Sequence, residues 1–180
     1  MTPQDFDYLR KLLRDRSGLV LAAEKQYLAE SRLLPVARRN AMSSLAELIE
    51  RLRSKSPAAL IAQVVEAMTT NETFFFRDKL PFDHFRDTIM PALVAARARE
   101  KRIRIWCTAA STGQEPYSLA MLLKGMGAAL AGYRVDIIAT DLSSEVLQKA
   151  KAGIYTQFEV QRGLPVQLLS PPGPRRGRPG

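Results

Sequence analysis

The chain has 180 residues, 46% of them hydrophobic, and carries a formal net charge of +9. This length and apolar content are enough for one or two small domains with packed cores. The positive charge favours an anionic partner, such as nucleic acid, acidic lipid or an acidic protein surface. A single cysteine excludes an internal disulfide, and no apolar run reaches the ~18 residues of a membrane span. With no signal-peptide pattern either, we expect a soluble cytoplasmic protein without membrane insertion.

Residues 1–68 have the apolar periodicity of a small helical bundle. We expect the first helix to be capped by Thr2, to carry Pro3 at its first position and to end at Gly18. Three further helices are expected at 24–40, after 43–44 and after 56–57.

The second of these helices carries three arginines, Arg32, Arg38 and Arg39. A solvated face is the more common explanation of such basic residues, whereas a docking surface for an acidic partner is the sharper hypothesis. Pro35 lies in the same segment and is expected to kink or divide the helix.

Helical periodicity is lost at residues 68–78, which read MTTNETFFFRD. Three consecutive aromatic residues between polar ones indicate a partly extended connector that packs into a cleft. As a plain linker, its Phe residues would fill an interdomain core. As a binding segment, it would present Asn71, Thr73 and Arg77 to a ligand. We expect the Phe residues to pack and the three polar residues to face a ligand.

A further helix is expected from Pro81 to about Arg99. His84 within it has no Cys or His neighbour with which to share a metal ion, so we expect no metal site.

Residues 103–121, read as IRIWCTAASTGQEPYSLAM, predict a strand, a turn of small residues and a helix. Small side chains let a ligand approach the backbone, although an ordinary strand-to-helix connection has the same pattern. A second buried strand is expected at 133–140. Asp141 at its end lies where nucleotide-binding α/β folds hold ribose hydroxyls; its alternative role is to cap the next helix.

Three segments in order, TTNETFFFRD, IRIWCTAASTGQEPYSLAM and ATDLSSEVLQKAKAGIY, resemble the CheR-type chemoreceptor glutamate methyltransferases. The resemblance covers residues 1 to about 169 and implies an α/β protein in which a small all-α domain precedes a Rossmann-like, S-adenosylmethionine-dependent methyltransferase domain. The expected parts are the four-helix domain at 1–68, the connector to the cofactor site at 69–80, the partial methyltransferase domain at 81–169 and a disordered tail at 170–180.

The resemblance implies a protein-glutamate O-methyltransferase of chemotaxis adaptation. Such an enzyme transfers a methyl group from S-adenosyl-L-methionine to glutamate side chains of methyl-accepting chemotaxis receptors and releases S-adenosyl-L-homocysteine. A carboxylate is ionised near neutral pH, so positioning of the reactants can supply catalysis without a strong general base. A basic helical domain suits an acidic helical region of the receptor, with Arg32, Arg38 and Arg39 as candidate docking residues.

Five positions match residues that contact the cofactor in the family: Asn71, Thr73, Arg77, Glu115 and Asp141. Arg77 also matches the connector arginine linked to the reacting centre. It is therefore our candidate catalytic residue, which can orient the incoming carboxylate. The structural alternative for Arg77 is an ion pair with Asp78 or Glu115.

Beyond about residue 169 the family continues with further strands, whereas a Pro/Gly/Arg-rich stretch follows here. We therefore expect a truncated domain with two strands, open sheet edges, weak cofactor binding and little turnover. A non-catalytic module that binds receptors through the basic helical domain is the alternative function. Nucleic-acid binding is less favoured because the basic residues are scattered and no binding motif is present, and the G-x-G-x-x-G spacing of NAD-binding folds is missing.

Overall fold

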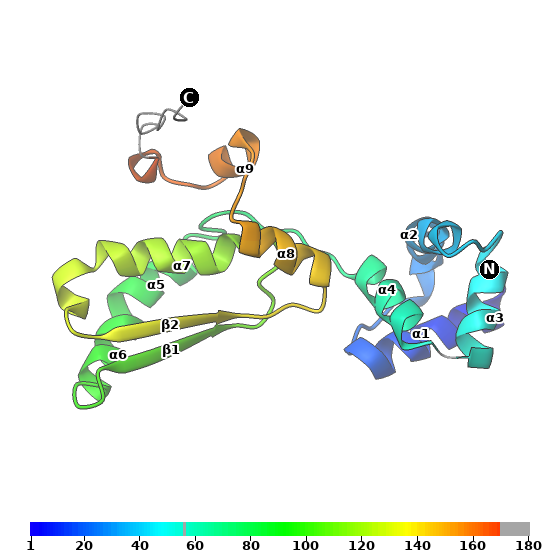
Figure 1. Cartoon of the computed structure of the whole chain (residues 1–180), viewed down its shortest axis with the longest axis horizontal. Helices are drawn as coiled ribbons and strands as arrows, with labels where there is room; N and C mark the ends of the chain where they lie inside the picture. The colour runs from blue at the N-terminus through cyan, green and yellow to red at the C-terminus, as the bar shows by residue number, and fades with distance from the viewer. Residues whose placement is uncertain (56, 170–180) are drawn as a thin grey trace, which may run out of the picture. The chain divides into compact units, whose positions relative to one another are not determined.

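A computed structural model describes residues 1–55 and 57–169, which form two compact units (Figure 1). The first unit comprises Met1–Thr70 with Leu142–Ser144, and the second comprises the rest of the described chain from Asn71 onward. The first is all-helical and the second contains helices and a small parallel sheet, which confirms the expected α/β class with an all-α part first. Ser56 and the tail at 170–180 lie outside the described residues.

The helical unit consists of α1 (Pro3–Ser17), α2 (Gln26–Arg39), α3 (Leu45–Lys55) and α4 (Ala58–Met68), with a 3₁₀ turn at Ala23–Lys25. The start of α1 is as predicted, because the Thr2 hydroxyl accepts the Asp5 N–H at 3.2 Å. Gly18 ends the helix with a φ of 73°. Pro35 lies inside α2, which continues past it and is therefore not divided.

All four helices contribute apolar side chains to one core. Burying each aliphatic side chain of this kind contributes about 1.5–3 kcal/mol, so the shared core is the main stabilising term of the unit. The residues with no exposed surface include Leu9 and Leu13 of α1, Leu33 and Val36 of α2, Leu48 and Leu52 of α3, and Val64 of α4.

The second unit is built on two parallel strands, β1 (Arg102–Cys107) and β2 (Arg134–Ala139). Their register pairs Ile103 with Val135 and Cys107 with Ala139. The helix α7 (Gln114–Gly125) and a 3₁₀ turn (Gly127–Leu130) connect them, as the strand–turn–helix pattern predicts. Two further helices follow β2, namely α8 (Ser144–Ala152) and α9 (Gln157–Gln161), before a 3₁₀ turn at Val166–Leu168.

The helix expected from Pro81 to about Arg99 is instead three consecutive elements. These are α5 (Leu80–His84), a π-helical turn (Phe85–Ile89) and α6 (Met90–Ala96). Pro91 has no N–H to donate to the carbonyl one turn earlier, so one hydrogen bond of a regular α-helical ladder is missing at this position. The widened turn lies directly before that proline.

The core of this unit lies on one face of the sheet. Ile103 and Cys107 are buried against Phe82, Met90 and Leu119. The opposite face is open in the described part of the chain: Trp106 is 68% exposed and its register partner Ile138 is 47% exposed. The prediction of a buried second strand is therefore wrong, since β2 has no fully buried residue. Its outward side chains include Arg134, which is exposed, and Asp136, which is half-buried and pairs with Arg134 at 3.0 Å.

Candidate functional site

The turn after β1 brings the carboxyl ends of both strands together. The Ala110 N–H donates to the Thr140 carbonyl at 3.0 Å, and the Thr140 N–H donates to the Cys107 carbonyl at 2.9 Å. Gly113 has a φ of 97°, and a Cβ there would lie 2.8 Å from the Tyr155 hydroxyl oxygen. A glycine is therefore required at this position for two reasons, the backbone angle and the close approach of Tyr155.

The connector packs its aromatic residues inward, as predicted. Phe75 is buried and meets Tyr155 edge-on at 5.0 Å between ring centroids. Phe76 meets Phe82 at 5.3 Å in the same manner. Phe76 also has a φ of 51°, which is unusual for a bulky residue and reverses the chain just before Arg77.

A pocket of about 420 Å³ opens beside the connector. Its lining includes Thr73 and Arg77 of the connector, Ala109 of the turn and Glu115 of α7. Arg77 is the cation of this lining, and Glu72 and Asp78 add two carboxylates to that of Glu115. The other lining residues are predominantly apolar and include Phe82, Phe85, Ile89 and Leu119.

The Arg77 side chain contacts three residues of the connector. Its guanidinium donates to the Glu72 carbonyl at 2.9 Å, lies 3.8 Å from the Asp78 carboxylate and stacks 5.7 Å from the Phe74 ring centroid. The Asp78 pair is the structural alternative considered from the sequence. It is long and solvent-exposed, and such pairs contribute little stability.

The remaining two candidates, Asn71 and Asp141, are both hydrogen-bonded to Ser111. The Ser111 N–H donates to the Asp141 carboxylate at 2.8 Å, and the Ser111 hydroxyl donates to the Asn71 carbonyl at 2.8 Å. Asn71 also lines a second pocket of about 320 Å³ that shares Thr73 with the first. Asp141 lines neither pocket, and α8 begins three residues later at Ser144.

Cys107 at the end of β1 is buried and close to Glu115. Burial, followed by the negative charge and hydrogen bonding of Glu115, raises the pKa of the Cys107 thiol to about 12. The thiol is therefore protonated at neutral pH and is not a nucleophile.

Sequence reasoning missed the polar residues that hold the site together. Ser111 and Ser118 are buried, and Tyr155 donates its hydroxyl to the Thr112 carbonyl at 2.6 Å. The sequence offered little reason to select these residues, because a serine in a helix or an isolated tyrosine usually has no special role. Only the clustering of small polar residues in ASTGQEPYS pointed to this region.

The three arginines proposed for docking differ in their surroundings. Arg32 donates to the Met68 and Thr69 carbonyls at 2.9 and 3.1 Å, so it satisfies the carboxyl end of α4. Arg38 and Arg39 are exposed in the last turn of α2.

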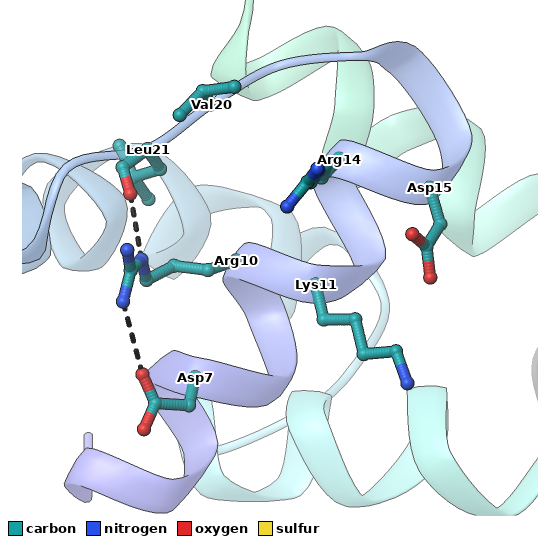
Figure 2. Close-up of a pocket in the computed structure, with 7 residues that line it drawn as sticks. All are labelled: Asp7, Arg10, Lys11, Arg14, Asp15, Val20 and Leu21. Carbon is teal, nitrogen blue, oxygen red and sulfur yellow. Dashed lines mark hydrogen bonds and ion pairs between the residues drawn. The ribbon is translucent and has the colours of Figure 1, made fainter.

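A separate hollow of about 490 Å³ lies on α1 (Figure 2). Its cationic residues include Arg10, which donates to the Leu21 carbonyl at 2.8 Å and pairs with Asp7 at 3.3 Å. Asp7 and Asp15 both belong to the lining, so the hollow is of mixed charge.

Within the described ranges, no group of three His, Cys, Asp or Glu side chains is placed to hold a metal ion. None of the helices in these ranges is long and apolar enough to cross a membrane.

Comparison with known proteins gives two family matches. Residues 4–69 match the CheR methyltransferase all-alpha domain, and residues 71–171 match the CheR methyltransferase SAM binding domain. The chain is 42% identical over 170 residues to Chemotaxis protein methyltransferase 1 of Pseudomonas aeruginosa, which covers 92% of this chain and 61% of the relative. It is 37% identical over 181 residues to Chemotaxis protein methyltransferase Cher2 of Pseudomonas putida, covering 96% of this chain and 65% of the relative.

A third relative, Chemotaxis protein methyltransferase 1 of Vibrio cholerae, is 37% identical over 166 residues, covering 91% of this chain and 59% of the relative. The chain therefore spans roughly 60% of the length of these curated relatives.

Proposed function

The chain belongs to the CheR methyltransferase family, and on this premise we propose that it transfers methyl groups to glutamate carboxylates of methyl-accepting chemotaxis receptors. The methyl donor is S-adenosyl-L-methionine, for which the matched domain is named. The observation that carries the proposal is the pocket whose lining combines Arg77 and Glu115 with apolar side chains.

The residues present fit the charged end of this donor. Its amino-acid part is a zwitterion, so the Glu115 carboxylate would bind the ammonium group while Arg77 and the Thr73 hydroxyl would bind the carboxylate. Phe82 and Phe85 would line the remaining, less polar part of the group. The pocket volume of about 420 Å³ is ordinary for a site of this class.

The nucleoside end has candidates at the strand termini. Asp141 follows β2 and accepts the Ser111 N–H at 2.8 Å, which fixes its carboxylate beside the turn after β1. A carboxylate held at this point can accept hydrogen bonds from ribose hydroxyls. Asn71 is tied to the same serine, so we propose both residues as nucleoside contacts.

When bound, S-adenosyl-L-methionine supplies an electrophilic methyl group on a positively charged sulfur. The protein has to bring an acceptor carboxylate to that methyl group in line and to exclude water. The Arg77 guanidinium has five N–H donors, so it can orient the acceptor carboxylate as well as hold the donor. A glutamate side chain is ionised at neutral pH, so no residue of the site has to remove a proton.

The proposal is tested by titration calorimetry with S-adenosyl-L-methionine and by transfer of a radiolabelled methyl group to a receptor's cytoplasmic fragment. We expect Glu115→Gln and Arg77→Ala each to weaken binding about tenfold or more, because each removes a charged partner. Arg104→Ala is the matched control, since Arg104 is an exposed arginine of β1 outside this pocket's lining. Equal affinity in all four proteins would refute the assignment of this pocket.

Receptor docking by the helical unit is a second part of the proposal. Arg38 and Arg39 are exposed at the end of α2, where they can meet an acidic helical surface. This leaves a non-catalytic receptor-binding module as the alternative function. Receptor binding without any methyl transfer in the assay above would favour that alternative. The weak cofactor binding and low turnover expected from the sequence stay predictions, which the same titration decides.

A further inference from the structure

The connector has no regular secondary structure, yet it carries Thr73 and Arg77 into the pocket. Two of its non-glycine residues have positive φ, 51° at Phe76 and 58° at Asp78. Each such residue costs about 1–2 kcal/mol relative to an ordinary conformation. The path of the connector must therefore be imposed by contacts with the surrounding structure.

Ser118 holds the end of the connector that carries Arg77. Its side chain is fully buried in α7. The Ser118 hydroxyl donates to the Gln114 carbonyl at 2.6 Å and accepts the Phe76 N–H at 3.0 Å. The first bond fixes the rotamer of the serine, so that its lone pair points at the backbone next to Arg77.

Ser111 holds the other end of the same segment. Its side chain is 6% exposed, and its hydroxyl donates to the Asn71 carbonyl at 2.8 Å. Between the two anchors, Phe75 is buried, and its carbonyl oxygen lies so close to Gly163 that a Cβ there would approach it to 2.0 Å. The segment is thus bonded at both ends and tightly packed in the middle.

We propose that the buried hydroxyls of Ser111 and Ser118 are positioning groups that set the connector so that Thr73 and Arg77 face the donor pocket. Neither hydroxyl has to touch a ligand for this role. Ser118 is the more direct of the two, because Phe76 adjoins Arg77 in the chain. This inference rests on the proposed function, since it assigns Arg77 and Thr73 to the donor.

The test removes each hydroxyl in the full chain and measures two quantities. The first is hydrogen exchange at the Phe76 amide, which does not depend on any ligand. The second is the affinity for S-adenosyl-L-methionine by calorimetry. Ser118→Ala should speed exchange at Phe76 about tenfold or more and weaken affinity about tenfold, because a buried N–H loses its acceptor and Arg77 loses its fixed position. Ser111→Ala should weaken affinity in the same direction.

Two variants separate the hydrogen bond from packing. Ser118→Thr keeps a hydroxyl that can also bond to the carbonyl four residues earlier, so it should restore protection of Phe76. Ser17→Ala is the matched control: its hydroxyl likewise bonds to the carbonyl four residues earlier, that of Leu13 at 2.7 Å, but in the helical unit. It should leave both measurements unchanged.

The outcomes are distinguishable. The Ser118–Phe76 anchor is overturned if hydrogen exchange at the Phe76 amide is unchanged in Ser118→Ala. It is also overturned if Ser118→Thr loses as much protection at this amide as Ser118→Ala does. Faster exchange with unchanged affinity overturns the positioning role. If the unaltered chain fails to bind S-adenosyl-L-methionine, the proposed function fails, whereas the exchange comparison still decides the anchor.

Discussion

Gly113 offers a quantitative test of the turn that forms the site. Replacing it with alanine places a Cβ 2.8 Å from the Tyr155 hydroxyl oxygen and 3.0 Å from the Ala150 Cβ, at a φ of 97°. The backbone angle costs about 1–2 kcal/mol for a residue with a Cβ. Displacing Tyr155 also breaks its hydrogen bond to the Thr112 carbonyl, which contributes about 1 kcal/mol. We therefore expect Gly113→Ala to destabilise the second unit by about 2–3 kcal/mol.

Two other glycines of the same unit separate these contributions. Gly132 has a φ of 78°, and its nearest neighbour is the flexible end of Lys101 at 3.7 Å, so Gly132→Ala should show the backbone cost alone. Gly125 has nothing within 4 Å and no positive φ, so Gly125→Ala should be neutral or slightly stabilising. Urea unfolding followed by circular dichroism gives the three values. A Gly113→Ala cost no larger than that of Gly132→Ala would refute the role assigned to Tyr155.

Three further predictions concern titration, reactivity and docking. Hydrogen bonding to Lys149 lowers the pKa of Glu159 to about 2. The contribution of Glu159 to the free energy of unfolding is therefore complete above pH about 4.5 and is lost as the pH falls toward 2. Glu159→Gln should make the free energy of unfolding depend less on pH in that window, and an unchanged pH dependence would contradict the Lys149–Glu159 ion pair. Cys107, with a pKa of about 12, should react with iodoacetamide at pH 8 only after unfolding, and rapid labelling of the native chain would count against its burial. Arg38→Glu with Arg39→Glu should reduce receptor methylation and its salt dependence without changing donor affinity, whereas an effect confined to donor affinity would exclude docking.

Local signals predicted the elements that local physics determines. The Thr2 cap, Pro3 and Gly18 fixed the first helix because each acts within one turn of its own position. The alternating Ile103, Ile105 and Cys107 likewise marked β1, since period-two burial needs only one covered face.

Features that depend on residues distant in the chain could not be predicted from local sequence patterns. Phe76 has a positive φ, and its N–H donates to the Ser118 hydroxyl, 42 residues later in the chain. Arg32 appeared to be a surface cation, yet it bonds to carbonyls 36 and 37 residues further along the chain. A buried strand was expected at 133–140, whereas β2 has no fully buried residue and its Arg134 is exposed.

The candidate site contains both residues that local sequence motifs predicted and residues that they did not. Thr73, Arg77 and Glu115 were identified by motif, and the structure places all three around one pocket. The roles assigned to them stay predictions until the donor is titrated. The serines that hold the connector carried no motif signal, because a buried hydroxyl is recognisable only when its partner is known.

The open face of the sheet carries an intrinsic fluorescent probe. The sequence contains one tryptophan, Trp106, and its indole N–H donates to the Thr140 hydroxyl at 3.0 Å, one residue before Asp141. Fluorescence excited at the indole band therefore reports on this side of β1. A macromolecule that covers that face would shift the emission to shorter wavelength.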